Sequence, residues 1–258
     1  MRPLFRKIGE TVRLGFSLAK TNFKLRNEGN YLGVAWYLLV PLSLFVIILL
    51  VRHAAFSDTG IEHYPVYLLI GITGFNFFRQ TISLSISAIH TNGGFIKSLN
   101  GISLEAFVLS QFIESVFSHA FELALVVGAM AYFGLPIAWV IFYPLVFLTF
   151  APFVLGLSLL FAAGGTYMRD FENVWNIAGQ LLFFATPIFY VARPESFAYS
   201  ANLFNPLFYF LSMARDVMLY RTVPSLWMIA TLFGAGIAVL FLGMGVFGKY
   251  KGRFSELV

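Results

Sequence analysis

Cysteine is absent from this chain of 258 residues, and charged residues are scarce. Without cysteine the chain has no disulfide framework, no zinc–thiolate site and no catalytic thiol. Charged residues make up 11%, whereas soluble domains carry about a quarter. Hydrophobic residues make up 59%, which is more apolar surface than a soluble fold of this size can hide. The composition therefore indicates an integral membrane protein with lipid as its solvent.

Signatures of catalysis and of metal binding are missing too. The sequence contains neither H-E-x-x-H nor G-x-S-x-G, and its four histidines have no metal-ligand spacing. Residues 243–249 match the G-x-x-x-x-G-K pattern of a phosphate-binding loop, but Tyr250 stands where the magnesium-binding hydroxyl belongs. The match also ends an apolar run instead of joining a strand to a helix. We therefore expect no ATP hydrolysis, metal site or cofactor in this chain.

Six apolar stretches are long enough to cross a bilayer, which takes about 20 mostly apolar residues. Their approximate bounds are Leu32–Val51, Tyr64–Ile89, Leu104–Phe133, Ile137–Ala163, Val174–Tyr190 and Leu226–Phe247. The sequence therefore predicts an all-α integral membrane protein with a six-helix transmembrane domain over residues 32–248. Residues 1–31 and 249–258 flank this domain as an N-terminal helix and a short tail.

Basic residues are distributed unequally around these stretches. Seven Lys or Arg precede the first stretch and three follow the sixth, and Lys97 and Arg169 fall in loops on the same side. Four arginines fall on the other side. The positive-inside rule therefore predicts a multi-pass protein with both termini in the cytoplasm.

The segment before the first stretch is predicted to be an amphipathic helix. Apolar residues recur at steps of three and four from Phe5 to Phe23, while Lys and Arg recur on another face. Such a helix lies in the membrane interface, attracted to anionic lipid headgroups. The alternative is a solvated helix docked on a partner protein.

The segment from about Val191 to Pro224 is predicted to form a re-entrant hairpin on the outer side. It contains three prolines, yet Leu203–Leu211 is strongly apolar and too short to span the membrane. A hairpin that enters the membrane without crossing it satisfies both observations. The alternative is an ordinary external loop with a buried apolar anchor.

Several polar residues fall inside the apolar stretches, where they are costly and need a reason. Arg79 lies well inside the second stretch, and Glu114, Ser118 and Glu122 follow one another at four-residue steps on one face of the third. These residues predict a polar strip that lines a path or pairs with Arg79 across helices. The alternative is that Glu114 reaches the membrane boundary and that the strip only joins helices.

Aromatic and small residues are mostly explained by the membrane and by packing. Tyr and Trp near the ends of the stretches are expected to form an interfacial belt. The alternative for Trp36, Tyr37 and Tyr190 is that they line a channel, where a ring face stacks against the C–H face of a sugar. The small residues Ala230, Gly234 and Ala238 predict a close contact between the sixth stretch and another helix.

Four local patterns resemble the ABC-2 type permeases that export O-antigen, capsule or teichoic-acid polymers, and together they extend over nearly the whole chain. They are Leu32–Pro41, which reads L-G-x-x-W-x-x-x-x-P; Tyr64–Gly71 with Thr91–Lys97; Arg169–Asn173 with Thr186–Tyr190; and Asn205–Pro206 followed by Arg215. In one departure, the residues after Lys97 read Ser-Leu-Asn-Gly-Ile where the family commonly has a Phe-Pro pair.

The resemblance implies a homodimeric channel in the bacterial inner membrane, with a separate subunit that binds ATP and magnesium. It also implies an undecaprenyl-linked polysaccharide as substrate, contacts with membrane lipids, and no nucleic acid. The implied ATPase-coupling loop comprises Asn92, Gly93, Gly94, Phe95, Ile96, Lys97 and Ser98, within the segment up to Ser103. The implied second cytoplasmic contact comprises Arg169, Asp170, Phe171 and Glu172. The implied periplasmic gate comprises Asn205, Pro206 and Arg215.

Other functions stay open from the sequence. The same fold serves exporters of drugs and lipids. A membrane-embedded enzyme acting on lipid-linked sugars would need paired carboxylates or a histidine beside a carboxylate, for which Glu114, His119 and Glu122 are the candidates. A structural scaffold would tolerate apolar substitutions at Arg79 and Glu122.

Overall fold

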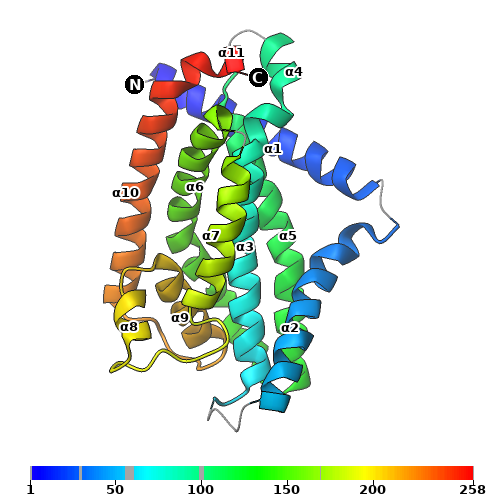
Figure 1. Ribbon diagram of the computed structural model, residues 1–258, viewed down its shortest axis with the longest axis vertical. Helices are drawn as coiled ribbons and strands as arrows, with labels where there is room; N and C mark the ends of the chain where they lie inside the picture. Colours follow the sequence, from blue (N-terminus) through cyan, green and yellow to red (C-terminus); the bar gives the residue numbers. More distant parts are fainter. Residues whose placement is uncertain (1, 29–30, 56–60, 99–101, 169, 258) are drawn as a thin grey trace.

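The computed structural model describes the whole chain except residues 1, 29–30, 56–60, 99–101, 169 and 258. All regular elements among the described residues are helical (Figure 1). The longer helices are α1 (Arg2–Glu28), α2 (Trp36–Ala55), α3 (Tyr64–Thr91), α5 (Glu105–Tyr132), α6 (Tyr143–Tyr167), α7 (Phe171–Ala185) and α10 (Leu226–Tyr250). The shorter ones are α4 (Gly93–Ser98), α8 (Phe197–Asn202), α9 (Pro206–Met218) and α11 (Phe254–Leu257), with 3-10 turns at Gly33–Ala35, Ile137–Phe142 and Lys251–Arg253. The predicted all-α class is confirmed.

Four segments are long and apolar enough to cross a membrane. They are Gly33–Ala54, Glu105–Tyr132, Ile137–Tyr167 and Leu226–Leu257. They make the chain a multi-pass membrane protein and correspond to four of the six predicted spans. The other two predicted spans correspond to α3, which carries several polar residues, and to α7, which has 15 residues. The count of six therefore stays a prediction.

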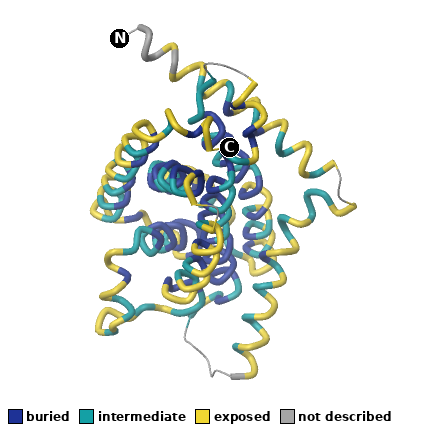
Figure 2. The backbone as a smooth tube through the Cα atoms, turned by 45° about the horizontal axis from the view of Figure 1, so that its top comes forward, coloured by how far each residue is buried: buried dark blue, intermediate teal, exposed yellow. Residues whose placement is uncertain are grey.

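α3 is the central helix of the bundle. It packs against α2, α5, α6, α7 and α9, and its half nearer Tyr64 is almost entirely buried. Figure 2 shows the buried residues concentrated in the middle of the bundle and exposed residues on the outer helices. A helix surrounded by protein does not need an apolar surface for lipid, so α3 tolerates polar residues that an outer helix would not.

α7 ends earlier than the sequence suggested. The predicted span Val174–Tyr190 is corrected to a helix over Phe171–Ala185. Thr186 has an extended backbone, with φ −82° and ψ 138°, because Pro187 follows it and disfavours the helical conformation of the preceding residue. Residues 186–190 therefore form a turn at the end of the bundle.

The contact between α6 and α10 is made through glycines. A Cβ atom on Gly243 would overlap the backbone of Gly156, and one on Gly156 would overlap the backbone of Leu240. The two helices therefore touch backbone to backbone. The predicted contact through Ala230, Gly234 and Ala238 is not made with α6, because these residues are exposed on the other side of α10, and a contact with a helix of a second copy stays a prediction. Two stripes of small residues run along this helix, and only the position of α6 decides between them.

The two ends of the chain lie at the same end of the bundle. The start of α1, together with α4 and α11, is at this end, and α8 and α9 are at the opposite end (Figure 1). α9 has 13 residues, too few to span a membrane, and it packs against α3 and α6. The structure therefore shows two short helices that cap the bundle, while their entry into the bilayer stays a prediction.

α1 lies against α5, and its contact face is narrow. Ala19 is fully buried, and the Thr11 hydroxyl donates a hydrogen bond to Ser103 at 2.9 Å. Ile8, Val12 and Phe16 are about half exposed, on a helix that also carries exposed basic residues. The predicted amphipathic helix is confirmed as a helix, and its position in the lipid interface stays a prediction.

Candidate functional site

The central feature of the site is a stripe of polar residues along the half of α3 nearer α4, here called the polar track. Its members are Asn76, Arg79, Gln80, Ser83, Ser87 and His90. Between residues 76 and 90 the partly exposed positions are these six and Leu84, and the rest are buried. Steps of three and four residues place them on one face of the helix. The track therefore runs through the bundle from its middle to one end.

α7 lies beside the track and is held there by Trp175. The indole Nε1 of Trp175 donates a hydrogen bond to the backbone oxygen of Arg79 at 3.3 Å. A Cβ atom on Gly179 would lie 3.3 Å from Cδ of Arg79, so the aliphatic part of this arginine passes directly beside α7. The missing side chain of Gly179 is what leaves space for it.

At Asn76 the track meets a buried polar network. The Asn76 amide donates a hydrogen bond to Oε1 of Glu122, whose Oε2 lies 3.2 Å from Nδ1 of His119. Nε2 of His119 lies 2.6 Å from the hydroxyl of Tyr143. The side chain of Glu122 is 1% exposed, so its carboxyl group would be costly without these contacts. The network fixes a carboxyl group beside the track.

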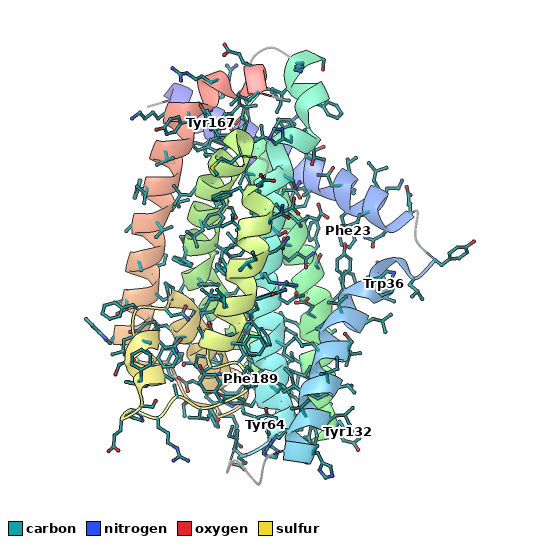
Figure 3. The ribbon with its side chains drawn as sticks, viewed as in Figure 1. Phe23, Trp36, Tyr64, Tyr132, Tyr167 and Phe189 are labelled. Carbon is teal, nitrogen blue, oxygen red and sulfur yellow. The ribbon has the colours of Figure 1, made fainter. Side chains whose placement is uncertain are left out.

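A cavity of about 340 Å³, here called the track cavity, opens beside this network. Five helices contribute to its wall, and Figure 3 shows Trp36 near the start of α2. The lining residues are Arg26, Trp36, Tyr37, Val40, Asn76, Arg79, Gln80, Ser83, Leu84, Glu122 and Asn176. Four residues predicted to line a channel, Arg79, Glu122, Trp36 and Tyr37, are therefore brought together around one space.

A second cavity, of about 380 Å³, lies at the other end of the track. It is lined by Ile86, Ser87, His90, Gly165 and Glu172. Nε2 of His90 is buried and has no hydrogen-bond partner among the described residues. The track therefore connects two polar cavities, one in the middle of the bundle and one near α4.

Two members of the predicted strip lie elsewhere. Glu114 pairs with Arg26 of α1, with Nη1 and Oε1 2.7 Å apart, and its side chain is 4% exposed. The Ser118 hydroxyl donates a hydrogen bond to the backbone oxygen of Glu114 at 3.2 Å. Glu114 therefore belongs to the contact between α1 and α5, and the Ser118 hydroxyl bonds within α5. Glu114 forms an ion pair with Arg26, and Glu122 lies beside His119, so the proposed pairing with Arg79 is not what the structure shows.

Tyr190 lies at the opposite end, beside a groove of about 810 Å³ between α2 and α7. Its hydroxyl donates a hydrogen bond to the backbone oxygen of Ala185 at 2.8 Å. The groove is largely apolar, with Arg52 and Arg193 in its wall. Such a lining suits an alkyl or prenyl chain better than a sugar.

Arg215, predicted as part of a gate, holds the turn after α7 onto α3. Its Nη1 and Nη2 donate hydrogen bonds to the backbone oxygens of Pro187 and Ile188, each at 2.8 Å. Its guanidinium carbon lies 3.5 Å from the centre of the Tyr67 ring. Burial lowers the pKa of Arg215, although a guanidinium stays protonated under physiological conditions.

Asn205 and Pro206 begin α9. Oδ1 of Asn205 accepts a hydrogen bond from the backbone N–H of Leu207, and its amide donates one to Oγ1 of Thr186 at 3.0 Å. Pro206 occupies the first turn of the helix, where its missing N–H costs nothing. The structure thus gives both residues a helix-starting role, and their part in a gate stays a prediction.

The predicted coupling loop contains a helix, α4. Phe95 is 58% exposed and Lys97 is exposed, whereas Ile96 is buried against the end of the bundle. The Asn92 amide donates a hydrogen bond to the backbone oxygen of Ala88 at 2.8 Å and joins α4 to α3. Exposed Phe and Lys on a fixed helix suit a docking surface, and the docking itself stays a prediction.

Of the predicted second contact, Arg169 lies outside the described residues. Asp170 precedes the first turn of α7. Phe171 packs against Phe161, with 5.3 Å between the ring centres. Glu172 is exposed and lines the cavity near His90. The contact would therefore lie at the same end of the track as α4.

Several residues of the site escaped the sequence analysis: Asn76, Gln80, Ser83, Ser87, His90 and Asn176. A signal was present, because the first five follow one another at steps of four, three, four and three within an apolar stretch. Asn176 had no such signal, since only the packing of α7 on α3 brings it to the track.

The structure also bears on ATP and metals. Residues 243–249 lie within α10, where helical hydrogen bonds occupy the backbone N–H groups, so this segment forms no phosphate-binding loop. Within the described parts of the chain, no group of three His, Asp or Glu side chains is placed to hold a metal ion.

The helical bundle and the polar track along α3 define a multi-pass membrane protein with a stripe of polar side chains in its central helix. Residues 14–219 match the family described as ABC-2 type transporter, and the chain therefore belongs to that family. It is 25% identical over 245 residues to the O-antigen export system permease protein RfbA of Klebsiella pneumoniae, covering 93% of each chain. It is 24% identical over 267 residues to the protein of the same name from Myxococcus xanthus, covering both chains completely.

Proposed function

We propose that this chain is the membrane-spanning subunit of a transporter that exports an undecaprenyl-linked, O-antigen-like polysaccharide across the bacterial inner membrane. Two relatives named for O-antigen export match it over 93% or more of their length. The observation that carries the proposal is the polar track. A glycan needs hydrogen-bond partners along its way through an apolar bundle, and the track offers them from the middle of α3 to its end.

The energy is proposed to come from a separate subunit that binds ATP and magnesium. α4 and the start of α7 would form the contacts with that subunit, because both lie at the end of the bundle that carries the chain termini (Figure 1). The excess of Lys and Arg at this end supports a cytoplasmic position for it. Closure of the ATP-bound subunit would push on α4 and, through Asn92, on the end of α3.

The proposed assembly is a homodimer with six spans from each copy. α3 and α7 would be the fifth and sixth spans, in addition to the four apolar ones. A second copy facing the partly exposed track would close the track off from lipid. A track that is open to lipid would be costly, since each unsatisfied polar group in hydrocarbon costs several kcal/mol. This cost supports a second copy rather than lipid on that side.

The test is complementation of a strain that lacks the chromosomal gene, with surface glycan as the readout. We expect the variant with Gln80→Leu and Ser83→Leu to accumulate at normal levels but to leave the glycan inside the cell. Ser43→Leu, an equivalent change on the exposed face of α2, should export normally. A normal amount of surface glycan in the double variant would show that the track is not part of the export path.

The same strain separates the alternatives. Deletion that leaves surface glycan intact but alters the export of a drug or lipid would redirect the proposal to another substrate of the family. Turnover of a lipid-linked sugar by the purified chain without an ATPase subunit would indicate an enzyme instead.

A further inference from the structure

We propose that the track cavity binds one sugar ring of the transported glycan. This inference rests on the proposed function and adds a defined site to it. The volume of about 340 Å³ lies at the lower end of the range of small-molecule sites, about 300–1,000 Å³. A space of this size suits one ring and its substituents rather than a folded stretch of polymer.

The wall of the cavity combines an aromatic ring with neutral hydrogen-bonding groups. Trp36 is half exposed and lines the cavity from α2, while Gln80, Ser83 and Asn176 line it from α3 and α7. A pyranose ring has an apolar C–H face that stacks on an aromatic ring, and hydroxyls that both donate and accept hydrogen bonds. Amide and serine side chains also do both, so they match hydroxyls without selecting a single configuration.

The hydroxyl of Tyr37 is the second observation that indicates a ligand. It is buried and has no hydrogen-bond partner among the described residues, and the Tyr37 side chain forms part of the cavity wall. Its ring is held in place by stacking on Phe23, with 5.8 Å between the ring centres. Buried hydroxyls are nearly always hydrogen-bonded in folded proteins. A sugar hydroxyl would supply the missing partner when the ligand moves aside the atoms that cover this hydroxyl.

The charges favour a sugar over a diphosphate. Arg26 and Arg79 both line the cavity, but Arg26 is paired with Glu114 at 2.7 Å. The carboxyl group of Glu122 stands in the same wall as Arg79. A ligand with several negative charges would face this carboxyl group at close range, whereas a neutral ring would not. The cavity therefore fits the uncharged part of a lipid-linked glycan.

The experiment measures sugar binding to the purified full-length chain, together with its ATPase subunit where the two purify as a complex. Methyl glycosides of glucose, mannose, galactose and N-acetylglucosamine are added, and saturation-transfer NMR detects bound sugar and the ring face in contact. We expect binding, with the strongest transfer to the protons of one C–H face. Trp36→Ala should abolish that face preference.

Two pairs of variants make the test specific. Tyr37→Phe removes the unpartnered hydroxyl alone, and Asn176→Ala removes one amide. Each should weaken sugar binding by roughly threefold to tenfold, as expected for one lost hydrogen bond. Tyr37→Phe should not lower the melting temperature, because the hydroxyl has no partner within the described chain. The matched controls Tyr132→Phe and Asn173→Ala change exposed residues outside the cavity and should bind as the unmodified chain does.

The outcomes separate this inference from the proposed function. If the chain restores surface glycan in the deletion strain but binds no glycoside, the sugar site is wrong and the export function stands. If inorganic pyrophosphate binds, if Arg79→Gln weakens that binding, and if no glycoside binds, the cavity recognises phosphate and the proposal is overturned. If surface glycan is not restored, the export function itself is wrong. Equal glycoside binding by Tyr37→Phe, Asn176→Ala and their controls would place the sugar elsewhere.

Discussion

The guanidinium of Arg215 lies 3.5 Å from the centre of the Tyr67 ring while it donates hydrogen bonds to the backbone oxygens of Pro187 and Ile188. One side chain thus joins α9, α3 and the turn after α7. The Thr-Pro-Ile-Phe-Tyr turn cannot continue as a helix past Pro187, so its carbonyl groups need donors from outside. Arg215 supplies two of them.

Removal of this arginine should destabilise the end of the bundle that carries α8 and α9. We expect Arg215→Ala to cost about 2–4 kcal/mol, because charge-assisted hydrogen bonds are lost and buried carbonyls stay unsatisfied. Thermal unfolding of the detergent-purified protein, followed by tryptophan fluorescence, measures this cost. Arg193→Ala, at an exposed arginine in the same region, serves as the control. Equal melting temperatures for the two variants would contradict the role assigned to Arg215.

The ion pair between Arg26 and Glu114 predicts an asymmetry between its two partners. The Arg26 side chain is 38% exposed and that of Glu114 is 4% exposed. Arg26→Ala leaves a buried carboxylate unpaired and should cost about 1–3 kcal/mol, whereas Glu114→Gln leaves an arginine that water can reach. The double variant with Arg26→Ala and Glu114→Gln should therefore be more stable than Arg26→Ala alone. Thermal unfolding of the three variants decides this, and a double variant that is the least stable would refute it.

The glycine contact between α6 and α10 gives a prediction with a control on the same helix. Gly243→Ala places a Cβ atom into the backbone of Gly156 and should destabilise the protein. Gly245→Ala meets nothing within 4 Å and should be neutral or stabilising by up to about 1 kcal/mol, since Ala is the better helix former. Both effects are read as shifts in melting temperature. Identical shifts would mean that the two helices do not touch at Gly156.

The two sides of α4 should respond differently to truncation. Phe95→Ala changes an exposed ring and should leave stability unchanged but reduce co-purification of the ATPase subunit and surface glycan. Ile96→Ala creates a cavity in a buried position and should lower stability by about 2 kcal/mol. Phe204→Ala, at an exposed phenylalanine of the opposite end, should affect neither. Full co-purification with Phe95→Ala would argue against docking through this face.

The length of the apolar stretches was enough to predict most of the helices. The helices around Leu44, Phe150 and Leu232 follow from runs of apolar residues that only a membrane accommodates. The end of α7 was misplaced because residues 186–190 are as apolar as a span, and the effect of Pro187 on its neighbour is local rather than a matter of composition. The stripe of α10 that contacts α6, with Gly236 and Gly243, was missed because small residues occur on two faces of this helix.

The site could be predicted only where polar residues stand out against apolar surroundings. Arg79 and Glu122 did so, and both line the track cavity. The partner of Glu114 could not be found in this way, because Arg26 precedes the first span and reaches α5 only through the path of α1. The position of Asn176 at the cavity likewise depends on the fit of Gly179 beside Arg79. This fit is a contact between α7 and α3, and the sequence of neither helix alone reveals it.

The contact of Gly156 with Gly243 limits how the protein can change shape. Two helices whose backbones touch cannot slide or tilt past one another without a clash. α6 and α10 are therefore expected to move as one rigid body. α2 is mostly exposed and has no such contact to hold it. Any widening of the bundle that lets a bulky cargo through must therefore leave α6 and α10 together and move other helices, such as α2 and α7, relative to them.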